Sequence, residues 1–437
     1  MKINNKGFIY GLIFAIVCMG GIAAYKPFKE DVKTAFGELL VGELHPVFQG
    51  SFDYTVDNTL LNTNTVTNGG TVTQASAMAV LSTSTTTNST AMFQTKQHAK
   101  YRPGLGGLLR FTALFTSPVA DTQQLIGLSD QSGSSTFFKN GFMVGYNGNT
   151  FGFHRFQNDV LTTVTQANWD DPLGGTGASA MTLDQTKINV WQIRFQYLGG
   201  GAIQLWVEDD DTGNFVLVHT IDYANQNTSP SVHNPNFHYT MWVDNNGTTS
   251  DMILKGASYA YFIEGKTSLI ELHQPQNSTD VQEKTSVTTE VAIFTIRNRA
   301  AYAGKTNYID VVLESINASI EANSANNLGN VRVIRNATLG GSPSFSNIGT
   351  DTSVVEIDTA GTTVTGGTAL EVYFLAGKND KIHKDVLGLQ IILNPNDTIT
   401  LSGTSANSAT IDGALLWKEL FYSQDWWIKQ QENSWLQ

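Results

Sequence analysis

The sequence predicts an all-β protein in which two β-sandwich or jelly-roll domains follow an N-terminal transmembrane helix. Three observations lead to this prediction. Charged residues make up only 15% of the 437 residues, and Gly, Ser, Thr and Asn are abundant, which suits strands and turns rather than helical bundles. Apolar and polar side chains alternate through most of the chain, as in half-buried strands. One uncharged apolar segment precedes this body.

The apolar segment runs for nineteen residues, from Gly7 to Tyr25, with lysines on both sides. A bilayer core needs roughly 20 apolar residues of helix, so this segment is long enough to anchor the chain in a membrane. A cleaved secretory signal is the alternative, although the segment exceeds the usual length of a signal core. The predicted anchor side chains are Phe8, Ile9, Leu12, Ile13, Phe14, Ile16, Val17 and Ile22.

Charge and cysteine content exclude several classes of function. The net charge is −12 and no basic patch is present, so we expect no nucleic-acid partner. The single cysteine, Cys18, lies in the apolar segment, so the body has no disulfide and no cysteine-based metal site. Motifs of serine hydrolases, zinc proteases and phosphate-binding loops are absent. We therefore predict that the chain is not an enzyme and needs no cofactor.

Composition divides the chain into five parts. We expect a membrane anchor and short helix over 1–37, a large β-sandwich over 38–265, a polar linker over 266–290, a smaller β-sandwich over 291–423, and a Trp-rich tail over 424–437. The tail fits either a terminal helix packed on its own domain or a docking segment for a partner or membrane surface.

The first sandwich has the clearest strand pattern. Asn147-Gly148 separates two aromatic strands and predicts a hairpin with a type I′ turn. Trp191, Ile193 and Phe195 alternate with polar residues and predict one buried face. Residues 209–214 predict a second hairpin turn.

Turn signals divide the second sandwich into further short strands. The strands are expected at 291–296, 308–313, 331–335, 354–358, 370–375, 387–393, 399–401 and 414–420.

Two loops carry the candidate binding residues. Trp169, Asp170 and Asp171 place an aromatic ring beside carboxylates, a pairing that suits a sugar site; the alternative is a loop whose tryptophan closes the core. Asp209 and Asp211 belong to an acidic run that is a weak calcium candidate. A hairpin turn is the alternative, because the run lacks the bidentate Glu of an EF-hand.

Histidines add no convincing metal site. His154, His219, His233 and His238 fall in the first sandwich. A metal site would need further ligands converging on them. We expect these residues at exposed loop positions and predict no metal ligands among them.

Five segments stand out in the sequence: Tyr101-Arg-Pro-Gly with Arg110–Phe115, Gly141–Gly148 with Phe151–His154, Arg335–Pro343, Val355–Gly367 and Trp417-Lys-Glu419. Together they resemble a family of virus and bacteriophage structural proteins with a concanavalin-like sandwich. The resemblance implies a capsid, vertex, spike or fibre component. The apolar N-terminus departs from a tailed-phage fibre and points to a virus with a membrane.

The sequence therefore predicts a virion structural protein tethered to a viral membrane, with other virion proteins and copies of itself as partners. A host-attachment protein that binds a surface glycan is the first alternative. A secreted carbohydrate-active enzyme is the second, with Asp170 or Asp171 as the required carboxylates. We expect the protein in the virion, associated with the membrane, or secreted if the leader is cleaved.

Overall fold

The computed structural model describes residues 44–56, 61–99, 101–130, 138–265, 275–322, 327–349, 352–389 and 391–421. Regular structure in these ranges consists of strands and two 3₁₀ turns, η1 (Gln166–Asn168) and η2 (Leu387–Leu389), so the all-β prediction is confirmed. The predicted anchor, the short helix after it and the tail at 424–437 lie outside the described residues. Within the described ranges, no helix has the length and hydropathy to cross a bilayer.

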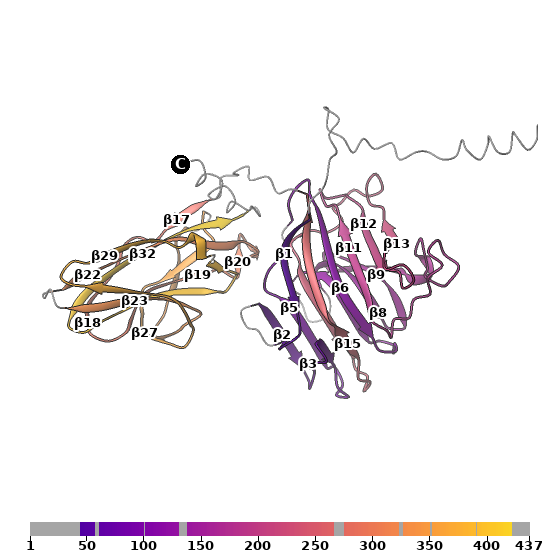
Figure 1. The fold of residues 1–437 in the computed structure, drawn as a ribbon, viewed down its shortest axis with the longest axis horizontal. Helices are drawn as coiled ribbons and strands as arrows, with labels where there is room; N and C mark the ends of the chain where they lie inside the picture. The colour runs from indigo at the N-terminus through magenta and orange to yellow at the C-terminus, as the bar shows by residue number, and fades with distance from the viewer. Residues whose placement is uncertain are drawn as a thin grey trace, which may run out of the picture. The chain divides into compact units, whose positions relative to one another are not determined.

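The first module runs from β1 to β16 and contains a nine-stranded and a seven-stranded antiparallel sheet (Figure 1). The nine-stranded sheet contains β1 (Leu44–Ser51), β3 (Thr71–Ala75), β4 (Met78–Ser82), β6 (Gly106–Phe115), β11 (Asn189–Phe195), β12 (Ile203–Glu208), β13 (Phe215–Ile221), β15 (Ile253–Gly256) and β16 (Ser258–Glu264). The seven-stranded sheet contains β2 (Asn62–Thr67), β5 (Thr90–Thr95), β7 (Gln123–Ser129), β8 (Asn140–Asn147), β9 (Thr150–Gln157), β10 (Val160–Thr165) and β14 (His238–Asp244).

Aromatic side chains from both sheets form the core of the first module. The ring of Phe142 on β8 lies 5.5 Å from that of Phe195 on β11, and Phe111 on β6 lies 6.2 Å from Tyr239 on β14. Trp191 and Ile193 are fully buried, as their alternation predicts. Each such side chain contributes about 1.5–3 kcal/mol on burial, so the sandwich is stable without a disulfide.

The two predicted hairpins are present. β8 and β9 pair up to Asn147 and Thr150, and the positive φ of 58° lies at Gly148. Asn147 is therefore the last strand residue, and Gly148 is the first loop residue, where a type II′ turn has its glycine; the type I′ assignment is wrong. The second hairpin joins β12 to β13 across residues 209–214.

The second module contains two six-stranded antiparallel sheets and two short strand pairs. The first sheet contains β17 (Gln276–Ser278), β18 (Gln282–Val287), β22 (Asp310–Ala322), β29 (Lys381–Asp385), β30 (Ile392–Leu393) and β32 (Ala409–Leu420). The second contains β19 (Val291–Asn298), β23 (Leu328–Arg335), β25 (Phe345–Asn347), β26 (Val355–Asp358), β28 (Thr368–Ala376) and β31 (Thr398–Ser405). The pairs are β20 (Ala301–Tyr302) with β21 (Lys305–Thr306), and β24 (Thr338–Gly341) with β27 (Gly361–Thr365).

A separate apolar core lies between the two six-stranded sheets. Trp417, Phe294 and Leu401 are fully buried in it. A Cβ placed on Gly413 would lie 2.3 Å from the Cδ2 of Leu401, so this glycine allows β32 to approach the facing sheet.

Two boundary predictions differ from the structure. β17 and β18 pair with β32, so the second module begins inside the predicted linker 266–290. The polar residues of β18 are mostly exposed, which hides the strand from a hydrophobicity pattern. The strand expected at 387–393 is instead η2 followed by the two residues of β30.

Candidate functional site

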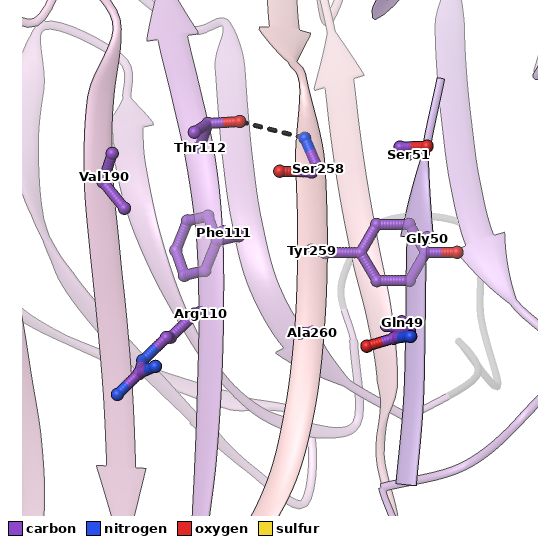
Figure 2. A pocket seen from close by; sticks show the side chains of 10 residues that line it. All are labelled: Gln49, Gly50, Ser51, Arg110, Phe111, Thr112, Val190, Ser258, Tyr259 and Ala260. Carbon is purple, nitrogen blue, oxygen red and sulfur yellow. Dashed lines mark hydrogen bonds between the residues drawn. The ribbon is translucent and has the colours of Figure 1, made fainter. Parts of the chain in front are cut away.

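A groove of about 550 Å³ lies on the nine-stranded sheet, across β1, β16, β6 and β11. We call it the outer groove. It is lined by Gln49, Gly50, Ser51, Arg110, Phe111, Thr112, Val190, Ser258, Tyr259 and Ala260, which Figure 2 shows on these strands.

Strand register explains why the sheet is hollowed here. Ala260 pairs with Arg110 on one side and with Gln49 on the other, and Ser258 pairs with Ser51. Small side chains thus meet on adjacent strands, because paired residues share one face of a sheet. Longer side chains, Arg110 and Gln49, stand at the end of the groove that also holds Ala260 (Figure 2).

The base of the groove is fixed by Tyr259. Gly50 pairs with Tyr259, and a Cβ on Gly50 would lie 2.5 Å from the tyrosine hydroxyl. The ring therefore occupies the space above the glycine, as Figure 2 shows. Its other side stacks on Tyr239, with ring centres 4.3 Å apart. Burial raises the pKa of Tyr259 to about 12, so the hydroxyl stays neutral and belongs to the core.

Arg110 carries the one formal charge among the lining residues. Its guanidinium carbon lies 5.6 Å from the ring centre of Phe262 and 5.8 Å from that of Phe215. The Nε atom is buried without a hydrogen bond. The structure gives Arg110 these ring contacts but no hydrogen bond or ion pair with any described residue.

The neighbouring Arg194 shows the contrast. Its guanidinium lies 4.7 Å from the ring centre of Trp206 and donates hydrogen bonds of 3.1 and 3.3 Å to Gln192. It also lies 3.8 Å from the carboxylate of Glu264. Arg194 is thus satisfied within the sheet, whereas Arg110 is held in place but lacks an anion.

Trp169, the predicted sugar platform, is a core residue. It is 4% exposed, contacts the rings of Phe151 and Trp191, and donates a hydrogen bond from Nε1 to the carbonyl of Val164 at 3.1 Å. A buried ring offers no face to a sugar, so this part of the glycan prediction is corrected. The alternative interpretation, a loop whose tryptophan closes the core, describes the structure.

The two neighbouring carboxylates hold the same loop. Asp171 is buried and accepts hydrogen bonds from the amides of Leu173 and Ser179 at 3.1 and 2.7 Å. Burial raises its pKa, but hydrogen bonds from Ser179 and Leu173 outweigh burial and lower the pKa overall. Asp170 accepts a hydrogen bond from the Thr220 amide at 2.9 Å and lies 3.2 Å from Nδ1 of His219. These contacts give both carboxylates structural roles.

The acidic run forms a hairpin turn. Oδ1 of Asp209 accepts hydrogen bonds from the amides of Asp211 and Thr212 and from the Thr212 hydroxyl. Those bonds with Thr212 lower the pKa of Asp209. Among the described residues, no group of three or more His, Cys, Asp or Glu side chains could hold a metal ion. The calcium interpretation of Asp209 and Asp211 is therefore replaced by the turn.

Two of the histidines expected in exposed loops are buried. His154 lies on β9, with Nδ1 2.9 Å from the Thr163 hydroxyl and Nε2 3.0 Å from the carbonyl of Gly145. Burial lowers its pKa to about 4. His238 lies at the start of β14 and is also buried. No sequence pattern distinguishes these positions from loop histidines, because the polar partners of His154 come from β8 and β10 and the burial of His238 depends on the packing of distant segments.

Buried carboxylates in the second module were missed by the sequence analysis. Glu419 is fully buried and accepts four hydrogen bonds, from Trp417 Nε1, Asn277 Nδ2, Ser353 Oγ and the Val354 amide, at 2.5–3.0 Å. It therefore joins β32 to β17 and to the loop before β26.

A second buried carboxylate, Asp397, binds Arg335 at 2.5 Å and Asn336 at 3.0 Å. Burial raises its pKa, but the contacts with these two side chains lower it overall. Glu419, Arg335 and Asn336 all lie in the sequence segments that resemble virion structural proteins. Those segments therefore include residues that stabilise the fold.

No family model and no curated protein matches this sequence. Among solved structures, the lectin UEA-II in complex with galactose is 10% identical, covers 50% of this chain and 99% of its own, and has a TM-score of 0.34. Winged bean acidic lectin in complex with methyl-α-D-galactose is 9% identical over 52% and 99%, with a TM-score of 0.34.

A pseudo β-1,3-glucanase and immunostimulatory antigen of Mycobacterium tuberculosis is 10% identical over 50% of this chain and 98% of its own, also with a TM-score of 0.34. Similarity at this level carries no argument about the function of this chain.

Proposed function

We propose that this chain is a structural component of a virion, with two rigid β-modules outside a viral membrane and the apolar segment 7–25 as the tether. Other virion proteins and further copies of the chain are its partners in this proposal. The sequence resemblance to virion structural proteins supports it, and so does the structural use of the carboxylates.

The observation that carries the proposal is that buried carboxylates hold loops and strands together. Asp171 accepts the amides of its own loop, Asp209 accepts those of a hairpin turn, and Glu419 joins three segments of the second module. Each is engaged by hydrogen bonds that a catalytic carboxylate would have to give up. This pattern favours a building block over an enzyme.

Rigidity without covalent cross-links also supports a structural role. Each module has its own buried core, rich in aromatic side chains in the first module and centred on Trp417 in the second. The chain's one cysteine is Cys18, so apolar burial and buried hydrogen bonds stabilise the modules. A shell or spike subunit needs modules that keep their shape under load.

Host attachment through a glycan is the second candidate function. Trp169 no longer supports it, because its ring is buried. The outer groove does, because it is open, lined by hydroxyl groups and provided with an unpaired cation. The two functions are compatible, since a surface subunit of a virion can also bind a receptor.

Detergent fractionation of purified particles tests the structural role and the tether together. The proposal expects the full-length chain in intact particles and its release with the lipid fraction. A chain absent from particles would overturn the proposal. A chain that stays with the shell after lipid removal and lacks its first 25 residues would overturn the tether.

A further inference from the structure

The guanidinium of Arg110 is held in position to bind an anion, and no carboxylate of the described residues contacts it. Two aromatic rings hold its guanidinium, and its buried Nε has no acceptor. An arginine that is partly desolvated in this way gains most from a carboxylate, because charge-assisted hydrogen bonds are stronger than neutral ones. Arg332 and Arg335 in the second module illustrate the usual case, since each contacts a carboxylate.

The rest of the outer groove is lined by neutral hydrogen-bonding groups and small side chains. Gln49, Ser51, Thr112 and Ser258 line it, and none of the described residues that line it carries a carboxylate. The Thr112 hydroxyl oxygen accepts the amides of Ala257 and Ser258 at 2.7 and 3.1 Å, and Figure 2 draws the second of these bonds. Both bonds use the oxygen as acceptor, so the hydroxyl proton remains available to a ligand.

We propose that the outer groove binds an acidic saccharide, with the sugar carboxylate on Arg110. The saccharide lies over Ala260, and its hydroxyl groups bond to Gln49, Ser51, Thr112 and Ser258. A groove of about 550 Å³ is within the range of about 300–1,000 Å³ typical of small-molecule sites. This inference goes beyond the structural role, because a virion subunit can be assembled without using the groove.

The lining favours a saccharide over the acidic side chain of a protein partner. Protein interfaces place apolar or aromatic anchors in pockets. The two aromatic residues that line the groove, Phe111 and Tyr259, are only 2% and 9% exposed and contribute to the core instead. The hydroxyl groups on short side chains, together with the amide of Gln49, match the many hydroxyls of a sugar.

Calorimetric titration of the full chain with N-acetylneuraminic acid and with glucuronic acid tests this inference, with galactose as the neutral comparison. We expect the acids to bind and galactose to bind at least about 10-fold more weakly, which corresponds to the loss of one charge-assisted hydrogen bond. Arg110→Gln should weaken binding of the acids by at least about 10-fold. Arg194→Gln is the matched control and should bind like the parent.

A second variant distinguishes loss of sugar binding from loss of folding. Ser258→Trp fills the groove from an exposed strand position and should abolish binding with an unchanged melting temperature. Failure of both acids to bind the parent would overturn the inference, as would equal binding of galactose.

Self-association that is lost in Arg110→Gln, without any sugar binding, would assign the groove to a protein partner instead. Incorporation of the Arg110→Gln variant into particles is measured as well. The structural role requires this incorporation whether or not the groove binds sugar, so the result distinguishes failure of the sugar inference from failure of the structural role.

Discussion

Arg110 and Phe262 form a cation–π pair at 5.6 Å on the face of the nine-stranded sheet, and within the described residues this arginine has no carboxylate partner. The pair sits at one end of the outer groove, where alternation on β6 and β16 brings a long cationic side chain beside small neutral ones. The sequence offers no sign of this arrangement, since Arg110 and Phe262 are far apart along the chain.

The buried position of Trp169 gives a stability prediction. We expect Trp169→Ala to destabilise the first module by about 3–5 kcal/mol, because it leaves a cavity beside Phe151 and Trp191. Chemical denaturation measures the change in the free energy of unfolding, and hydrogen exchange shows in which module the loss occurs. Trp206→Ala, at a partly exposed position on β12 of the same module, should cost much less. Equal losses in the two variants would show that Trp169 is not a core residue.

Glu419 provides the equivalent prediction for the second module. Glu419→Ala leaves four donors without their acceptor, and each unsatisfied buried group costs about 1–3 kcal/mol. We expect hydrogen-exchange protection to fall throughout the second module and to stay unchanged in the first. Glu321→Ala, at an exposed position of β22, is the control and should change stability by less than about 0.5 kcal/mol.

Because His154 is buried, we expect the stability of the first module to fall at acidic pH. Its folded-state pKa of about 4 lies below the ordinary value of 6.5, so the unfolded chain binds more protons as the pH falls. Its contribution to stability is therefore complete above pH 6.5 and is lost between 6.5 and 4, by about 3 kcal/mol.

Urea titrations at pH 7 and pH 4 measure the loss of unfolding free energy between the two pH values. The loss should be smaller by about 3 kcal/mol in His154→Gln. The exposed His233→Gln is the control and should keep the acid sensitivity of the parent. An undiminished loss in His154→Gln would contradict the assignment.

The turn at Asp209 makes a prediction about calcium. Asp209→Ala removes three hydrogen bonds within the β12–β13 turn and should lower the melting temperature of the chain. Asp211→Ala should cost little, since the Asp211 side chain is exposed. Calcium should leave the melting temperature of the parent chain unchanged. A rise in melting temperature with calcium that disappears in Asp211→Ala would restore the metal interpretation.

Local pattern predicted most of the strands, because alternation reports directly which face is buried. Trp191, Ile193 and Phe195 are examples of this. The strand β18 was not predicted, because its residues are mostly polar and exposed and show no alternation of apolar and polar side chains.

The candidate site was not predictable in the same way. The outer groove depends on cross-strand register between residues as distant as Ser51 and Ser258, and the burial of Trp169 depends on strands that pack against its loop. Loop composition alone does not distinguish a ring that faces solvent from one that closes a core.

Copy number in purified particles tests the central claim most directly. Quantitative mass spectrometry of intact virions should find this chain at a fixed ratio to the other shell proteins, the same in every preparation. A chain that is absent, or present at a low and variable ratio that falls with further purification, would contradict a structural role.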